Sequence, residues 1–159
     1  MAALADPIAE ELSAIDPDNA DMYAENAEKF KEEMTGLDEI YHDGLAQCST
    51  KTFLVTHEAF GYIANSYDLD QQAIAGIETD TEPSPARVAE IVDMIEELDV
   101  DKIFATSEAE ASIAQTIAEE ADLEVGVLDA LATQVDPEQD YHDVMTKNLS
   151  ELQDALGCQ

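Results

Sequence analysis

Basic residues are scarce in this 159-residue chain. It has 6 lysine and arginine residues against 38 aspartate and glutamate residues, which gives a formal net charge of −32. Surfaces that bind nucleic acids or anionic membranes need clustered positive charge. The composition therefore excludes both kinds of partner.

Long apolar runs and several common motifs are also missing. No run approaches the roughly 20 apolar residues of a membrane-spanning helix, and no basic, apolar leader follows Met1, so we expect neither a transmembrane helix nor an export signal in this sequence. It contains no GxGxxG or GxxxxGKS/T phosphate loop, no GxSxG nucleophile turn and no CxxC pair. The usual signatures of nucleotide-binding proteins and serine hydrolases are thus absent.

The residues that are present suit one folded unit. Hydrophobic residues make up 45% of the chain, which is enough for a core, so the charge does not indicate disorder. At molar salt the Debye length falls to about 3 Å and the repulsion between carboxylates is screened. We interpret the acidic, lysine-poor composition as that of a halophilic protein; the alternative is an acidic protein from ordinary salt.

Helical spacing of apolar residues dominates both ends of the chain. Apolar residues recur every three or four positions over 1–15, and again from Tyr23 to Leu45, which predicts one long amphipathic helix. The same spacing marks helices over 60–67, 88–98, 113–121 and 141–156, with start signals at Ser84-Pro85 and a capping box from Ser107 to Glu110. Asn148 begins a glycosylation triplet inside the last helix, and we treat that match as chance.

Four short apolar runs alternate with these helices and predict the fold class. They cover 52–55, 73–77, 102–105 and 124–128, and none alternates between apolar and polar residues, so each should be buried on both faces. The predicted fold is therefore α/β: a four-stranded, doubly wound parallel sheet with flanking helices, preceded by a long strut helix.

Candidate ligands for a metal ion follow these strands directly. Ligands bind beyond the carboxyl ends of parallel strands, where this sequence places His57, Glu78–Glu82, Thr106–Glu108 and Asp129. An imidazole with a carboxylate suits zinc or manganese, although zinc takes four ligands. The alternatives are an exposed histidine at a helix start and an ordinary loop aspartate. The other histidines, His42 and His142, do not obviously complete a set.

Several runs resemble, in order, the solute-binding proteins of zinc and manganese ABC importers. The main run is FLVTHEAFGY at 53–62. The supporting runs are DPDNA at 16–20, TEPSP at 81–85, VLDAL at 127–131 and DYHDVM at 140–145, followed by Asn148, Leu149 and Leu152. The resemblance covers nearly the whole chain.

That resemblance implies a domain organisation, a function and a ligand set. In the family a rigid helix joins two α/β lobes and the metal lies between them. Residues 1–47 would supply amino-terminal helices, including the inter-lobe helix over about 20–45, and residues 48–159 the carboxy-terminal lobe. His57 and Asp129 would bind the metal. Manganese-preferring members often carry an acid at the His57 position, so zinc is the expected ion and manganese the alternative.

The resemblance also implies partners and a location. The protein would be no enzyme: it would capture the metal outside the membrane and deliver it to an ABC permease. The family's other two ligands are histidines of an amino-terminal lobe, which this sequence does not include. A truncated, non-functional or interaction-only lobe is therefore an alternative, and a metal-dependent hydrolase a more distant one.

The two cysteines are predicted to form a disulfide. Cys48 lies just before the first strand and Cys158 just after the last helix, and the wound topology brings both to the amino edge of the sheet. Export to an oxidising compartment, which the resemblance implies, would permit the bond. Two free thiols are the alternative.

Overall fold

The computed structural model describes residues 2–74, 85–98, 100–106, 111–133 and 136–159. The chain forms two compact units, residues 1–43 and residues 44–159.

The first unit is a helical hairpin. Two short 3₁₀ turns, η1 (Ala2–Leu4) and η2 (Pro17–Asn19), flank α1 (Ala5–Ile15), and α2 (Ala20–Leu45) follows. The turn is held by Asp16, whose Oδ2 accepts hydrogen bonds from Asn19 Nδ2 at 2.7 Å and Tyr23 OH at 2.9 Å. These bonds lower the pKa of Asp16 and raise that of Tyr23. The long helix expected over about 20–45 is thus confirmed.

An apolar groove of about 470 Å³ runs along this hairpin. Its walls come from α1 and α2, and its residues are Leu4, Ala5, Ile8, Ala9, Leu12, Tyr23, Asn26, Ala27 and Phe30. Leu4 and Ile8 are more than half exposed. Lys31 joins the two helices, because its Nζ lies 2.8 Å from Asp6 on α1 and 2.9 Å from Glu28 on α2.

The second unit contains the predicted parallel sheet. Its strands are β1 (Thr52–Val55), β2 (Asp70–Ala73), β3 (Lys102–Ala105) and β4 (Glu124–Val127). They lie in the order β2-β1-β3-β4, and every neighbouring pair is parallel. The chain thus winds outward in both directions from the β1–β3 pair, as the alternation of strands and helices predicted.

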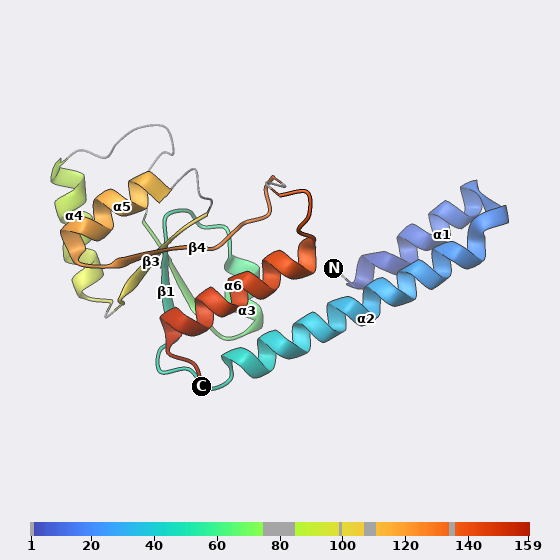
Figure 1. Ribbon diagram of the computed structural model, residues 1–159, viewed down its shortest axis with the longest axis horizontal. Coiled ribbons are helices and arrows are strands. Elements are labelled where there is room, and N and C mark those ends of the chain that lie inside the picture. Colours follow the sequence, from blue (N-terminus) through green and yellow to red (C-terminus); the bar gives the residue numbers. More distant parts are fainter. Residues whose placement is uncertain (1, 75–84, 99, 107–110, 134–135) are drawn as a thin grey trace. The chain divides into compact units, whose positions relative to one another are not determined.

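Helices cover both faces of the sheet. They are α3 (Gly61–Ser66), α4 (Pro85–Glu96), α5 (Ala111–Ala121) and α6 (Tyr141–Leu156). Figure 1 shows α4 and α5 together on one side of the strands, and α3 and α6 on the other. One continuous core packs α4 and α5 on the sheet, with Leu54, Ile74, Ile91, Ile95, Ile103, Ala105, Ala114, Ile117 and Ala118.

The second strand lies earlier in the chain than the sequence predicted. The structure places β2 at Asp70–Ala73, whereas the apolar run suggested 73–77, most of which lies outside the described residues. Polar residues are tolerated here because β2 is an edge strand. Burial on both faces, expected of all four strands, holds for the central strands β1 and β3 but is wrong for β2 and β4, whose first residues are exposed.

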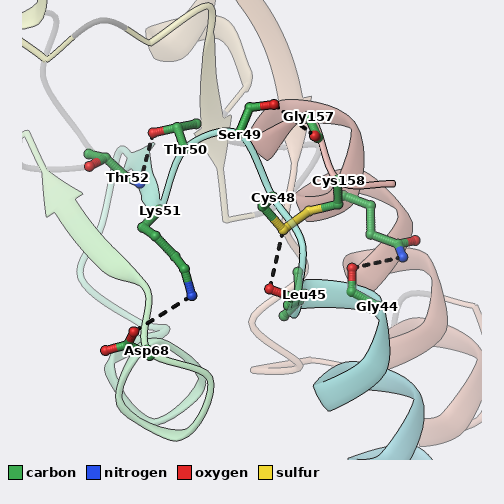
Figure 2. The surroundings of a disulfide bond; sticks show 11 residues. Gly44, Leu45, Cys48, Ser49, Thr50, Lys51, Thr52, Asp68, Gly157 and Cys158 are labelled. Atoms are coloured by element: carbon green, nitrogen blue, oxygen red, sulfur yellow. Dashed lines mark hydrogen bonds and ion pairs between the residues drawn. A yellow bond between two sulfur atoms is a disulfide. The ribbon is translucent and has the colours of Figure 1, made fainter.

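The amino edge of the sheet carries the predicted disulfide. Helix α6 begins with a capping box between Asp140 and Asp143 and ends at Gly157, whose φ of 60° is left-handed. Cys158 then bonds to Cys48, with an S–S distance of 2.01 Å. Figure 2 shows the loop before β1 beside this helix end, where Ser49 Oγ donates to the Gly157 carbonyl at 3.1 Å. The structure therefore agrees with the disulfide and not with two free thiols.

No described helix combines the length and the apolar character that crossing a membrane requires.

Candidate metal site at the carboxyl edge of the sheet

The candidate site lies at the point where the strand order reverses. Strands β1 and β3 are neighbours, but the chain continues from β1 to one side and from β3 to the other. Such a switch point leaves a crevice beyond the carboxyl ends of the strands, where α/β proteins bind ligands. The residues that follow β1, β3 and β4 therefore form the candidate site.

His57 stands in a short loop held from both sides. The Thr56 amide continues the sheet by donating to the Phe104 carbonyl at 2.9 Å. Past His57, the Phe60 amide donates to Gln71 Oε1 of the edge strand at 2.8 Å. Phe60 is buried, and His57 is exposed. The loop thus fixes the backbone of His57 while leaving its imidazole accessible to a ligand.

Asp129 follows β4 and is fixed more firmly. The β3–β4 ladder extends past the strand ends, since Leu128 donates to the Ala105 carbonyl at 3.0 Å and Ala130 to the Thr106 carbonyl at 3.3 Å. The Asp129 carboxylate is half-buried, and its Oδ1 accepts from the Leu131 amide at 2.7 Å. Leu131 has a positive φ of 56°. Asp129 therefore sits in a tight turn directly at the sheet edge.

Sheet register relates the two candidate ligands. Val55 pairs with Phe104, and Phe104 pairs with Gly126. His57 is two residues past Val55 and Asp129 three past Gly126, so they leave the sheet at nearly the same level. Two strand spacings separate their strands by about 10 Å. Two side chains pointing inward across that gap could reach one ion, since ligand bonds to zinc are about 2 Å long.

A small pocket of mixed polar and apolar lining opens beside Asp129. It has a volume of about 160 Å³ and is lined by the turn after β4 and the start of α6, with Asp129, Leu131, Thr133, Asp136, Gln139, Asp140, Tyr141 and Val144. Asp136 and Asp140 each accept a hydrogen bond from a nearby backbone amide. These two carboxylates therefore act in turn and helix capping.

The remaining sequence candidates contribute less to this edge. Thr106 is buried, His142 is exposed in the first turn of α6, and His42 is exposed on α2. Residues 78–83 and 107–108, the first four residues of the TEPSP run and the Ser107–Glu110 capping box lie outside the described residues. Within the described ranges, no three His, Cys, Asp or Glu side chains are grouped so that they could hold a metal ion.

Two polar residues at this edge were given no role in the site from the sequence. Asn148 of α6 is 1% exposed and bonds to the Asp129 backbone through both ends of its amide. Its position, four residues after Val144 and four before Leu152 on an apolar helix face, was the available signal. Thr56 is also buried, and no described group hydrogen-bonds its hydroxyl.

Comparisons with known proteins agree on one family. The model of that family, described as the periplasmic component A of the zinc-uptake complex (ZnuA), matches residues 1–155. The chain is 35% identical over 153 residues to the zinc-binding lipoprotein AdcA of Streptococcus pneumoniae, covering 94% of this chain and 30% of AdcA. It is also 35% identical over 145 residues to the high-affinity zinc uptake system protein ZnuA of Bacillus subtilis, covering 89% of this chain and 46% of that protein.

A solved structure extends the similarity to the fold. The Zn(II)-bound ZnuA-like domain of S. pneumoniae AdcA superimposes with a TM-score of 0.83 and 34% identity, over 94% of this chain and 57% of that domain. The chain therefore spans less than half the length of these curated relatives and a little more than half of this solved domain.

Proposed function

The chain belongs to the family of the periplasmic component A of zinc-uptake complexes, and we propose that it is the second, metal-capturing lobe of such a protein. One observation carries the proposal: His57 and Asp129 follow strands β1 and β4, two strand spacings apart, at nearly the same level, on the edge where α/β folds bind ligands. Binding, and not catalysis, is the activity proposed.

Zinc is the proposed ion and manganese the alternative. An imidazole nitrogen and a carboxylate oxygen are ligands that zinc accepts readily, whereas manganese favours oxygen ligands. Relatives whose names state zinc binding or zinc uptake support this choice. Two ligands are half of a tetrahedral zinc site, so we propose that an amino-terminal lobe supplies the others.

A feature of the first unit supports an amino-terminal lobe as a partner. Its groove of about 470 Å³ is apolar, and exposed apolar surface of that kind marks an interaction site. The relatives are at least twice as long as the matched segment. We propose that the amino-terminal lobe of a longer protein covers the groove between α1 and α2.

We propose that the protein works outside the cell membrane and hands its metal to an ABC permease. The Cys48–Cys158 disulfide supports this location, because such bonds persist in oxidising compartments. The acidic surface would keep the protein soluble in concentrated salt, which is the proposed halophilic adaptation.

Zinc titration of the chain, followed by NMR in 1 M KCl, tests the ligand assignment. We expect zinc to shift the His57 ring signals and the Asp129 amide together, with one dissociation constant. His57→Ala and Asp129→Ala should each weaken binding at least tenfold. The matched control is His42→Ala, because His42 is also exposed but lies on α2.

Two outcomes would contradict the proposal. If His57→Ala changes the zinc affinity by less than a factor of two, His57 is not a ligand. If manganese displaces zinc at equal concentration, the protein prefers manganese. The same titration repeated after fusion to the amino-terminal lobe of a relative should show much tighter binding in one step.

A further inference from the structure

We propose that Asn148 is a positioning residue that fixes Asp129 for metal binding; this inference rests on the proposed function. The two residues come from α6 and from the turn after β4. Asn148 has no access to a ligand, because only 1% of its surface is exposed. It acts on the site through its hydrogen bonds alone.

Both ends of the Asn148 amide are used on a single residue. Its Oδ1 accepts from the Asp129 backbone amide at 2.9 Å, and its Nδ2 donates to the Asp129 carbonyl at 2.9 Å. Exchanging Oδ1 and Nδ2 would place acceptor against acceptor and donor against donor, so this orientation alone satisfies the four groups. A buried amide without such partners would be strongly unfavourable.

The two hydrogen bonds between the Asn148 amide and the Asp129 backbone form a clamp. This clamp completes the restraint of the Asp129 carboxylate. Its Oδ1 already accepts from the Leu131 amide at 2.7 Å. Among the described residues, Oδ2 of Asp129 has no hydrogen-bond partner and remains available for a cation. With the backbone held by Asn148 and one oxygen held by Leu131, the carboxylate is oriented before any ion arrives.

Helix α6 is a firm support for this clamp. It is closed at its first turn by the Asp140–Asp143 capping box, packs through Leu149 and Leu152, and is tied beyond its last turn by the disulfide. Groups that orient a metal ligand without touching the metal usually change affinity 10- to 100-fold when removed. We therefore expect Asn148 to raise metal affinity through Asp129, without touching the ion.

The test uses Asn148→Leu and Asn148→Ser in the full chain, with Leu149→Ala as the matched control. Leu149 is the next residue of α6 and is also buried, but its apolar side chain forms no hydrogen bond to Asp129. Zinc affinity is read at the His57 ring, which the substitutions do not touch. Amide hydrogen exchange of Asp129 is measured without metal, and melting temperatures are compared.

We expect both Asn148 variants to speed exchange at the Asp129 amide and to weaken zinc binding about tenfold. Leu149→Ala should lower the melting temperature about as much as the Asn148 substitutions do, but it should keep zinc affinity within twofold of the wild-type value. Equal affinity losses in all three variants, or unchanged affinity in both Asn148 variants, would overturn the proposal. A wild-type chain whose His57 ring does not respond to zinc would overturn the proposed function itself, whatever the exchange rates.

Discussion

Cys48 and Cys158, 110 residues apart in the sequence, are joined by a disulfide at the amino edge of the sheet. The bond ties the loop before β1 to the end of α6, opposite the edge that carries His57 and Asp129. It closes a loop that includes the whole sheet. Its loss should therefore affect the stability of the second unit more than the geometry of the candidate site.

Cys158→Ser should destabilise the protein without abolishing metal binding. In the chain-entropy model a loop of this length contributes up to about 4.7 kcal/mol. We expect a lower melting temperature, and zinc shifts at His57 that persist while the chain stays folded. Titration of denatured, unreduced wild-type protein should find no free thiol; two reactive thiols would refute the bond.

Lys102→Met should destabilise the protein most at neutral pH. Lys102 Nζ lies 2.5 Å from Asp154, 3.8 Å from Glu124 and 4.0 Å from Glu151. The hydrogen bond and charge of Lys102 lower the pKa of Asp154. Burial alone would lower the pKa of Lys102, but Asp154, Glu151 and Glu124 raise it.

These pKa shifts define the pH window of the effect. The lowered pKa of Asp154 gives stability that is present above its unfolded pKa, about 4, and is lost as pH falls through the folded value. The raised pKa of Lys102 gives stability that is present below its unfolded pKa, about 10, and is lost as pH rises through the folded value. We expect Lys102→Met to lower the melting temperature by about 4 °C at pH 7 and by less near pH 2.

The control for that substitution is Lys51→Met. Among the described residues, Lys51 forms one ion pair, with the fully exposed Asp68 at 3.6 Å. Removing this equal charge should change the melting temperature by less than about 1 °C, since exposed ion pairs contribute little. Equal effects of the two substitutions would mean that net charge, and not the Lys102 cluster, sets the stability.

Gly126→Ala should be harmful because of packing. A Cβ atom at Gly126 would lie 2.6 Å from the ring of Phe104, which is fully buried. We expect destabilisation of about 1–3 kcal/mol in a urea titration. Gly36→Ala is the matched control: nothing lies within 4 Å of its Cβ position on α2, so alanine should stabilise that helix by about 0.5–1 kcal/mol.

Gln71→Ala should loosen the loop that carries His57. Gln71 Oε1 accepts from the Phe60 amide at 2.8 Å. Without it, amide exchange at Phe60 should become faster and zinc binding at His57 several-fold weaker. Gln72→Ala, in which an exposed bond to Asp70 is lost, should leave both unchanged; matching effects would show a general loss of the edge strand.

Added salt should stabilise the protein strongly. With a net charge of −32, repulsion opposes folding in dilute buffer and is screened at about 1 M salt. We expect the melting temperature to rise steeply from 0.1 to 2 M KCl at pH 7. The rise should shrink at acidic pH, because protonation of carboxyl groups lowers the net charge. A salt-independent melting temperature at pH 7 would refute the halophilic interpretation.

The sequence alone predicted the elements that have a regular pattern of apolar residues. The apolar runs at β1 and β3 are central strands, and the regular spacing from Tyr23 to Leu45 is α2. It misled at β2, because Asp70, Gln71 and Gln72 have little strand preference by themselves and are stabilised by pairing with β1.

Among the residues of the candidate site, some could be named from the sequence and others could not. His57 and Asp129 could be singled out because strand ends place residues on a known edge. The importance of Asn148 could not, because its partner is the backbone of Asp129, 19 residues earlier. The sequence showed Asn148 in the run that carries the resemblance, in a glycosylation triplet and on an apolar helix face, but none of these patterns names a partner. Burial on that face is what requires a partner for its amide.

The two outer strands have a consequence for how the protein behaves in concentrated salt. Each is only four residues long and begins with an exposed acid, Asp70 in β2 and Glu124 in β4. Once ions screen long-range repulsion, crowded copies could approach and add strand to strand. The short length of each outer strand and the carboxylate at its start would still discourage such fibre-like assembly. A short strand offers few backbone groups for pairing, and pairing would desolvate the acid.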